Sequence, residues 1–462
     1  MKRIAVVGSG VAGLSAAARL SKAPGARRVT LFEAADYFGG HAHTVDVSLP
    51  GPLGKLVTHG VDTGFLVMNE RTYPRLLALL AELGVSKAKS DMSFSVQVPE
   101  GQPGLSGLRP GLEWCGSSLN TVFAQRSNLG SGPFWRMLRD LLRFNRLSTR
   151  LAEQGADAAL AQPIGDFLAE HRFGAEFQEG YLLPMIACIW SCPTDQMLRF
   201  PMATLIRFCH NHGLLQVTNR PQWYTVAGGS AQYVRQLVAG LDDARLSTPV
   251  RGLSAWGDDG RSGVLVQTDT GAERFDEVVL ACHSDQALAL LGASATRDER
   301  ELLGAVGYHR NRAVLHTDTA MLPRTPRAWA AWNYERAGSL KAERQGVCLH
   351  YLINRLQPLP WTMPVVVSLN PLREPRAETV LGEYDYAHPV FDAAAIDAQG
   401  RLPSIQGRRG VWFCGAWTGY GFHEDGLKSG QLVADQLLAR ELAPAGSAQA
   451  SRGLNEFGRA VA

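Results

Sequence analysis

Short apolar runs and an Ala/Leu-rich stretch alternate at the N-terminus. Residues 3–7 form a short continuous apolar run, which is typical of a buried strand. Residues 11–20 predict a helix, and residues 29–32 predict a second buried strand. Strand, helix and strand in this order predict a βαβ unit, whose two strands run parallel in one sheet.

Two further apolar runs lie far along the chain, at 277–281 and 410–414. The second leads through several glycines into a stretch that predicts a helix over 427–438. Because strand-like runs of the same kind occur in three separate blocks, the sequence predicts one sheet interrupted twice by inserted segments.

The predicted fold class is α/β, with a Rossmann-type domain and an inserted α+β domain. The inserted blocks are richer in aromatic residues and in helical or alternating patterns, which is typical of a substrate-facing domain. The domain with the predicted sheet combines residues 1–75, 222–300 and 395–442, the inserted domain combines 76–221 and 301–394, and 443–462 form a tail.

Three glycines stand between the first predicted strand and its helix, in the sequence GSGVAG. In the GxGxxG pattern, Gly8 permits a tight turn, Gly10 lets the backbone approach a pyrophosphate, and Gly13 allows close packing of helix and sheet. The free N–H groups at the helix N-terminus favour an anion. The motif predicts these dinucleotide contacts: Gly8, Ser9, Gly10, Val11, Ala12 and Gly13.

Glu33 ends the second predicted strand, 20 residues after Gly13. A carboxylate at this position accepts hydrogen bonds from ribose hydroxyls and repels a 2′-phosphate. The position therefore favours FAD or NAD over NADP.

Composition restricts the class of protein. A length of 462 residues predicts two or three compact units, and 45% hydrophobic with 19% charged residues is typical of a globular protein. The net charge of +3 is too small to indicate a nucleic-acid-binding face. Seven cysteines without a CxxC pair favour a reducing cytoplasm, and no apolar run of about 20 residues predicts a transmembrane helix.

Residues 33–40, EAADYFGG, resemble the extended fingerprint of the FAD-dependent amine oxidase and phytoene desaturase superfamily. In that superfamily a second glycine pair approaches the pyrophosphate and an Arg usually follows, where this chain has His41. Residues 61–65 resemble the segment beneath the flavin, and 227–230 resemble a glycine turn before a helix. The resemblance implies an amine-oxidase-like fold with FAD as cofactor.

The end of the chain carries the same resemblance. Residues 412–417 and 421–427 resemble the closing FAD motif, in which a helix N-terminus faces the flavin. No Cys lies between 415 and 430 to attach the flavin, so noncovalent FAD is expected. Beyond the first motif, the implied cofactor residues are Glu33, Ala34, Gly40, His41, Gly64, Phe65, Val250, Gly415, Gly426 and Leu427.

Residues 69–74 and 415–420, NERTYP and GAWTGY, resemble a bacterial subgroup of flavoproteins related to desaturases of fatty acyl chains in furan fatty acid formation. The resemblance implies an FAD-dependent oxidoreductase that moves a hydride from a C–H bond of an apolar, fatty acyl substrate to flavin N5. Three alternatives stay open: a flavin-dependent double-bond isomerase, an amine oxidase, and a protein that carries FAD as a structural ligand only.

Polar residues stand immediately before the last predicted helix. His423 and Glu424 are candidate catalytic residues, and the alternative is that both, with Asp425 as N-cap, arrange the backbone at the helix start. His41 and His43 are alternatives for metal binding or covalent flavin attachment, but no Cys or carboxylate with ligand spacing accompanies them. No metal site is therefore predicted.

A basic helix is predicted over residues 134–151. Its arginines recur every three or four residues and share one side: Arg136, Arg139, Arg143, Arg146 and Arg150. The apolar residues are expected on the other side: Phe134, Met137, Leu138, Leu141, Leu142 and Phe144. Such a helix is either an ordinary solvated surface helix or a peripheral contact with the inner face of an anionic membrane. The oligomeric state is left open.

Overall fold

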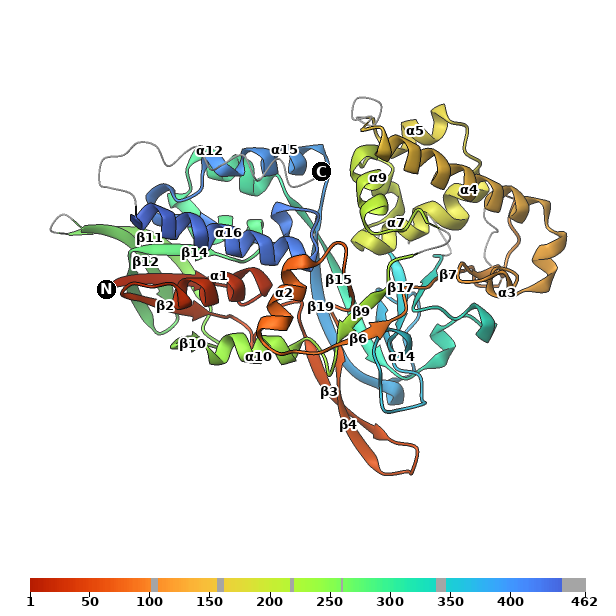
Figure 1. Ribbon diagram of the computed structural model, residues 1–462, viewed down its shortest axis with the longest axis horizontal. Helices are drawn as coiled ribbons and strands as arrows, with labels where there is room; N and C mark the ends of the chain where they lie inside the picture. The colour runs from red at the N-terminus through yellow and green to blue at the C-terminus, as the bar shows by residue number, and fades with distance from the viewer. Residues whose placement is uncertain (101–106, 156–161, 217–219, 259–260, 338–345, 443–462) are drawn as a thin grey trace.

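A computed structural model describes residues 1–100, 107–155, 162–216, 220–258, 261–337 and 346–442. Figure 1 shows two lobes, one around the N-terminal strand and the last helix, the other containing the helices of the middle of the chain. None of the seven cysteines is in a disulfide. Among the described residues, no helix combines the length and apolarity needed to cross a bilayer.

A five-stranded sheet lies at the centre of the first lobe. Its order is β10–β2–β1–β14–β20, and each strand pairs with its neighbours in parallel. Ile4 and Val6 of β1 are fully buried, as the apolar run predicts. The strand bounds are Asp243–Arg245 for β10, Arg27–Phe32 for β2, Lys2–Val7 for β1, Glu277–Leu280 for β14 and Val411–Phe413 for β20. The predicted Rossmann-type α/β class is confirmed, while the domain boundaries stay a prediction.

Two helices pack against one another beside this sheet (Figure 1). They are α1 (Val11–Lys22) and α16 (His423–Leu442), the second longer at both ends than the predicted 427–438. A Cβ on Gly430 would overlap the carbonyl oxygen of Ala12, so only glycine permits this approach of the two helices. The close approach holds the start of α16 beside the glycine-rich turn.

A seven-stranded mixed sheet organises the second lobe. Its order is β19–β15–β18–β17–β16–β7–β8, antiparallel throughout except for the parallel pair β16 and β7. The strands are β19 (Val380–Val390), β15 (Gly307–His316), β18 (Val366–Leu369), β17 (Cys348–Leu352), β16 (Trp332–Glu335), β7 (Phe94–Gln97) and β8 (Glu113–Cys115). The main helices of this lobe are α4 (Gly132–Glu153), α5 (Ile164–Glu170), α7 (Leu183–Trp190) and α9 (Met202–Asn211).

Smaller elements join the two lobes and cover their edges. The strands β3 and β4 form a hairpin that projects from the body in Figure 1. The remaining strands are β3 (Thr44–Pro50), β4 (Leu56–Asp62), β5 (Met68–Asn69), β6 (Lys87–Ser90), β9 (Trp223–Val226), β11 (Val250–Asp258), β12 (Arg261–Thr268) and β13 (Gly271–Phe275). The other helices used below are α2 (Pro74–Glu82), α3 (Leu119–Val122), α10 (Ala231–Ala239), α11 (Ser284–Leu291), α12 (Arg297–Gly304) and α15 (Ala393–Arg401).

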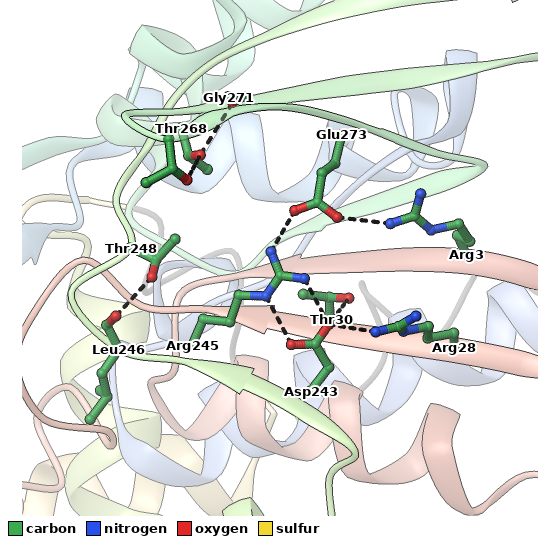
Figure 2. A network of polar contacts seen from close by, with 11 residues as sticks. Arg3, Arg28, Thr30, Asp243, Arg245, Leu246, Thr248, Thr268, Gly271 and Glu273 are labelled. Atoms are coloured by element: carbon green, nitrogen blue, oxygen red, sulfur yellow. Dashed lines mark hydrogen bonds and ion pairs between the residues drawn. The ribbon is translucent and has the colours of Figure 1, made fainter.

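A polar network fastens the antiparallel sheet β11–β12–β13 to the edge of the parallel sheet. Figure 2 shows Arg245 of β10 between Asp243 of its own strand and Glu273 of β13. Glu273 also accepts from Arg3 of β1 at 2.9 Å, and Thr30 of β2 donates to Asp243 at 3.0 Å. The Asp243 and Glu273 carboxylates raise the pKa of Arg245 above its ordinary value.

Candidate cofactor and active site

The turn after β1 has the geometry that its glycines predict. Gly8 adopts a φ of +101° and donates its N–H to the carbonyl of Phe32 at 2.9 Å. A Cβ on Gly13 would overlap the carbonyl oxygen of Gly8, so α1 starts directly against this turn. Val11 and Ala12 begin the helix, with Gly10 as its N-cap. The free N–H groups at this end of α1 therefore face the space beyond the turn.

Glu33 is held in a fixed position at the end of β2. Its carboxylate accepts hydrogen bonds from the backbone N–H of Ser9 at 2.8 Å, the Ser9 hydroxyl at 2.5 Å and the N–H of Ala35 at 2.9 Å. The Ser9 hydroxyl in turn accepts from Gly39 N–H at 3.1 Å. Ser9 thereby connects the first glycine turn, Glu33 and the second glycine pair, with exposed Ala34 beside them.

The two glycine pairs lie against each other and leave open space on one side. Gly40 has a φ of +57°, and a Cβ there would lie 3.2 Å from the Cα of Gly10. A Cβ on Gly10 itself would meet no atom within 4 Å. Two backbone turns with an opening at Gly10 provide the space that a pyrophosphate requires. The residues present therefore fit a dinucleotide.

His41 carries a buried polar atom without a partner in the described structure, its Nε2. Its ring centroid lies 5.0 Å from that of Tyr386, 5.2 Å from His388 and 6.3 Å from His283. Burial, followed by the neighbouring His388, holds the pKa of His41 well below its usual value. This nitrogen is therefore available for a hydrogen bond to a bound group or to water.

The segment beneath the expected flavin position is fixed by the backbone of His41. Phe65 donates its N–H to the His41 carbonyl at 2.7 Å, and a Cβ on Gly64 would overlap that oxygen. Asp62 accepts from the N–H of Ser230 at 2.9 Å and from the Gln357 side chain at 2.8 Å. Its burial raises the Asp62 pKa to about 6. Asp62 thus connects the 61–65 segment to the 227–230 turn.

The closing motif meets the first motif through glycine contacts. Gly415 has a φ of +155° and donates its N–H to the Ser429 hydroxyl at 2.9 Å. A Cβ on Gly426 would lie 2.8 Å from Cγ1 of Val11. Leu427 is fully buried in the core, while Val250 lies half-buried at the start of β11. Cofactor contacts of these residues stay predictions, because FAD is not part of the structure.

The His423 side chain, at the start of α16, is held in place by its neighbours and is uncharged. Its ring stacks on Phe65, with centroids 4.0 Å apart and planes at 15°, and its Nε2 lies 2.6 Å from the Tyr233 hydroxyl. Burial lowers the His423 pKa to about 3, so the ring is neutral near pH 7. These contacts indicate a packing role, and a catalytic role stays a prediction.

Glu424 and Asp425 bond to backbone N–H groups. The Glu424 carboxylate accepts from Arg75 at 2.8 Å and Leu76 at 3.0 Å, which places it over the first turn of α2. Asp425 accepts from the N–H groups of Phe422 at 3.0 Å and Tyr420 at 3.1 Å. Because α16 begins at His423, Asp425 is its third residue, so its predicted N-cap position is wrong although it does cap this end.

His43 bonds within the protein. Its Nδ1 lies 3.0 Å from the Thr63 hydroxyl and 3.1 Å from the Tyr386 hydroxyl, and its ring stacks on Tyr37 at 4.1 Å. Among the described residues, the group of side chains dense enough for a metal lies elsewhere, in the second lobe: Glu335, Cys348 and His350. In that group His350 Nε2 already lies 2.8 Å from the Glu335 carboxylate.

Aromatic side chains meet the segment just before α16. Phe422 stacks on Phe208 of α9, with centroids 4.7 Å apart and planes at 18°. Trp190 at the end of α7 and His212 lie 6.4 Å and 5.8 Å from the Phe422 ring. Burial lowers the His212 pKa to about 4, so this ring is also neutral near pH 7. The side of the closing motif that faces the second lobe is therefore apolar and uncharged at these positions.

Comparison with known proteins assigns the family. The model of the flavin-containing amine oxidoreductase family matches residues 11–310, more than half of the chain. The chain belongs to this family. It is an FAD-dependent oxidoreductase, and FAD is its cofactor.

Solved structures of diverse oxidoreductases and an isomerase share the fold. A CLA-producing fatty acid isomerase from P. acnes superimposes with a TM-score of 0.63 at 16% identity, covering 96% of this chain and 99% of its own. Putrescine oxidase bound to putrescine gives 0.62 at 17%, covering 95% and 99%. Cyclohexylamine oxidase from Brevibacterium oxydans IH-35A gives 0.60 at 16%, covering 96% and 99%. No curated protein matches significantly. At these identities the structures show the amine-oxidase-like fold alone.

Several residues around the site were not predicted from the sequence. His283 precedes α11 and His388 lies in β19, so neither shares a local motif with His41, although all three rings lie close together. The sequence indicates Asp62 only as part of the 61–65 segment and does not predict its hydrogen bond with Ser230. These residues come together only through the tertiary fold. Their spacing along the chain therefore gives no signal from which they could be predicted.

Proposed function

We propose that this oxidoreductase desaturates an apolar, fatty acyl substrate. FAD, when bound, supplies a two-electron oxidant that accepts a hydride at N5. The substrate would lose that hydride and a proton from the neighbouring carbon, forming a C=C bond, and oxygen or a separate acceptor would take up the electrons. The contribution of the protein is to bind and orient the C–H bond and to exclude water.

The observation that supports this proposal is the uncharged aromatic cluster of Trp190, Phe208, His212 and Phe422 beside the closing motif. An apolar aromatic surface suits an acyl chain, because burying hydrocarbon against it removes apolar area from water. The nearby carboxylates of Glu424 and Asp425 bond to backbone N–H groups. An amine oxidase is therefore the weaker alternative.

A double-bond isomerase is the second candidate, and it uses the same first step. In that reaction the hydride would return to a different carbon of the same chain, so no acceptor would be consumed. The fold that this chain shares with the CLA-producing fatty acid isomerase from P. acnes supports the inclusion of this candidate.

The test is anaerobic mixing of the FAD-loaded protein with fatty acids, phospholipids and amines, while the absorbance of oxidised flavin is followed. Stoichiometric bleaching by a lipid, with a new double bond in the product, supports desaturation. Catalytic turnover without an acceptor identifies an isomerase, and bleaching by amines alone contradicts the proposal.

A pair of variants tests whether the substrate binds beside the aromatic cluster. Phe208→Leu should change the chain-length dependence of KM, because the Phe208 ring lies against Phe422. Phe167→Leu is the matched control. Phe167 is also buried in the second lobe, but its ring packs on His171 at the end of α5 and not on Phe422. Equal effects of both variants on KM would remove the aromatic cluster from the substrate site.

A further inference from the structure

The exposed side of α4 carries apolar residues among its arginines. Trp135 and Leu142 have 49% and 50% of their surface exposed. The sequence predicts Leu142 on the apolar side of the helix, and this prediction is wrong for Leu142. It is confirmed for Phe134, Met137 and Phe144, which are buried. At 3.6 residues per turn, Leu142 lies between Arg139, three positions before it, and Arg146, four positions after it, on the same side of the helix.

The apolar surface continues into the residues that precede α4. Leu119 of α3 is 80% exposed, and Leu129 of the short helix η1 (Arg126–Gly130) is 52% exposed. The indole N–H of Trp135 donates to the Leu129 carbonyl at 2.9 Å. The Phe123 ring at the end of α3 lies 5.2 Å from the Trp135 ring, so α3, η1 and α4 meet at the start of α4, and the surface that carries their exposed residues is hereafter called the α4 face.

The positive charge on this face is only partly neutralised. Arg136 pairs with Glu176, and Arg139 and Arg143 lie near the buried carboxylate of Asp140. Arg146 and Arg150 form no ion pair with a described side chain, and both are exposed. They line a shallow hollow of about 360 Å³ together with Asn145, Thr149, Glu153 and Leu215.

We infer that the α4 face binds the surface of an anionic phospholipid bilayer. Exposed Trp and Leu side chains enter the boundary between headgroups and acyl chains, and arginines around them bind lipid phosphates. The arginine excess on α4 complements anionic lipid, whereas a second copy of this chain would place like charges together. The inference rests on the proposed function, because membrane binding would give the enzyme access to an acyl substrate held in the bilayer.

The test uses the full-length FAD-loaded protein and co-sedimentation with vesicles of phosphatidylcholine, with and without phosphatidylglycerol. Arg146→Glu with Arg150→Glu should weaken binding to anionic vesicles by roughly tenfold or more, because each arginine near the surface contributes substantially to binding. The matched control is Arg297→Glu with Arg300→Glu, the same charge change on exposed positions of α12 in the other lobe. The flavin content of each variant reports folding.

Binding of the wild type that falls with salt and is lost only in the α4 variant supports the inference, since screening weakens attraction between surface charges. A Leu142→Asp variant should reduce binding at high salt as well, because it removes the apolar contact. Absence of wild-type sedimentation, or equal loss in both charge variants, overturns the inference. Either outcome leaves the proposed reaction open, because anaerobic reduction with a soluble short-chain substrate does not require a membrane.

Discussion

The Tyr233 hydroxyl and Nε2 of His423 lie 2.6 Å apart, joining α10 to the first residue of α16. Both groups are buried, so removing one leaves the other unsatisfied at a cost of about 1–3 kcal/mol. We expect Tyr233→Phe and His423→Leu each to lower the free energy of unfolding by that amount, with little effect on the rate of flavin reduction. Denaturant unfolding and stopped-flow reduction measure the two effects.

The double variant Tyr233→Phe with His423→Leu serves as control, since it removes both partners. We expect it to be less destabilised than the sum of the single variants. Loss of flavin reduction in His423→Leu alone, at unchanged stability, would instead identify His423 as a catalytic residue.

Glu424 caps a helix that is distant in the sequence, α2. Glu424→Ala should reduce stability by about 1 kcal/mol, as loss of a cap does, and leave flavin reduction by substrate intact. Glu424→Gln, which keeps an acceptor oxygen, should recover part of the stability. Thermal unfolding and single-turnover reduction distinguish this outcome from a catalytic role, for which Glu424→Gln would be as inactive as Glu424→Ala.

The sequence predicts what is local in this fold. Four strands of the parallel sheet and the turn at Gly8 follow from apolar runs and glycine spacing, which depend on neighbouring residues alone. The short polar edge strand β10 has no such signal and is not predicted. The partner of Glu424 lies at Arg75, 349 residues away in the sequence, and no periodicity carries that information. The sequence allows a backbone-capping role for Glu424, but it does not show that the capped helix is α2.

The same limit applies to the faces of elements. Leu142 was assigned to the buried side of its helix because it is apolar, yet its direction is set by the register that Phe134 and Phe144 impose in the core. Likewise, the motif identifies His41, whereas its ring neighbours are His283, just before α11, and His388 in β19, which only the tertiary fold brings together.

Gly10 and Gly13 should respond differently to the same substitution. Gly10→Val should fold, since a Cβ there meets no atom within 4 Å, but should lose FAD because the side chain fills the opening beside the turn. Gly13→Val should fail to fold stably, because its Cβ would overlap the Gly8 carbonyl. Flavin content and circular dichroism of the two proteins provide the measurement. Normal flavin content in Gly10→Val would contradict the assignment of the opening to the pyrophosphate.

Mild acidification should destabilise the protein because of its buried histidines. Burial lowers the pKa of four histidines to about 3 or 4, so on acidification they bind protons in the unfolded chain first, and stability falls. They are His212, His316, His388 and His423. Each should cost roughly 1 kcal/mol between about pH 7 and pH 5.5. Asp62 and Asp425, with a pKa raised to about 6, act in the opposite direction but are fewer.

Urea unfolding with saturating FAD at both pH values measures this dependence. His212→Phe should reduce the loss of unfolding free energy between pH 7 and pH 5.5 by roughly 1 kcal/mol, because the variant keeps an aromatic ring at this position but removes the titrating group. A protein that becomes more stable as the pH falls over this interval would show that these histidines are protonated in the folded state.

His41 stands where the superfamily usually has Arg, and its Nε2 is buried without a partner in the described structure. We expect His41→Leu to weaken FAD binding about tenfold to a hundredfold, the effect of losing one hydrogen bond to a charged group. His41→Arg should bind FAD at least as tightly as the wild type, because a fixed charge replaces a neutral ring near the pyrophosphate. Titration of the apoprotein with FAD, followed by flavin fluorescence, gives the dissociation constants. His59→Leu is the control, since His59 lies in β4 beside Trp361 and away from His41. Equal affinities of His41→Leu and His59→Leu would show that the unpaired nitrogen does not face the cofactor.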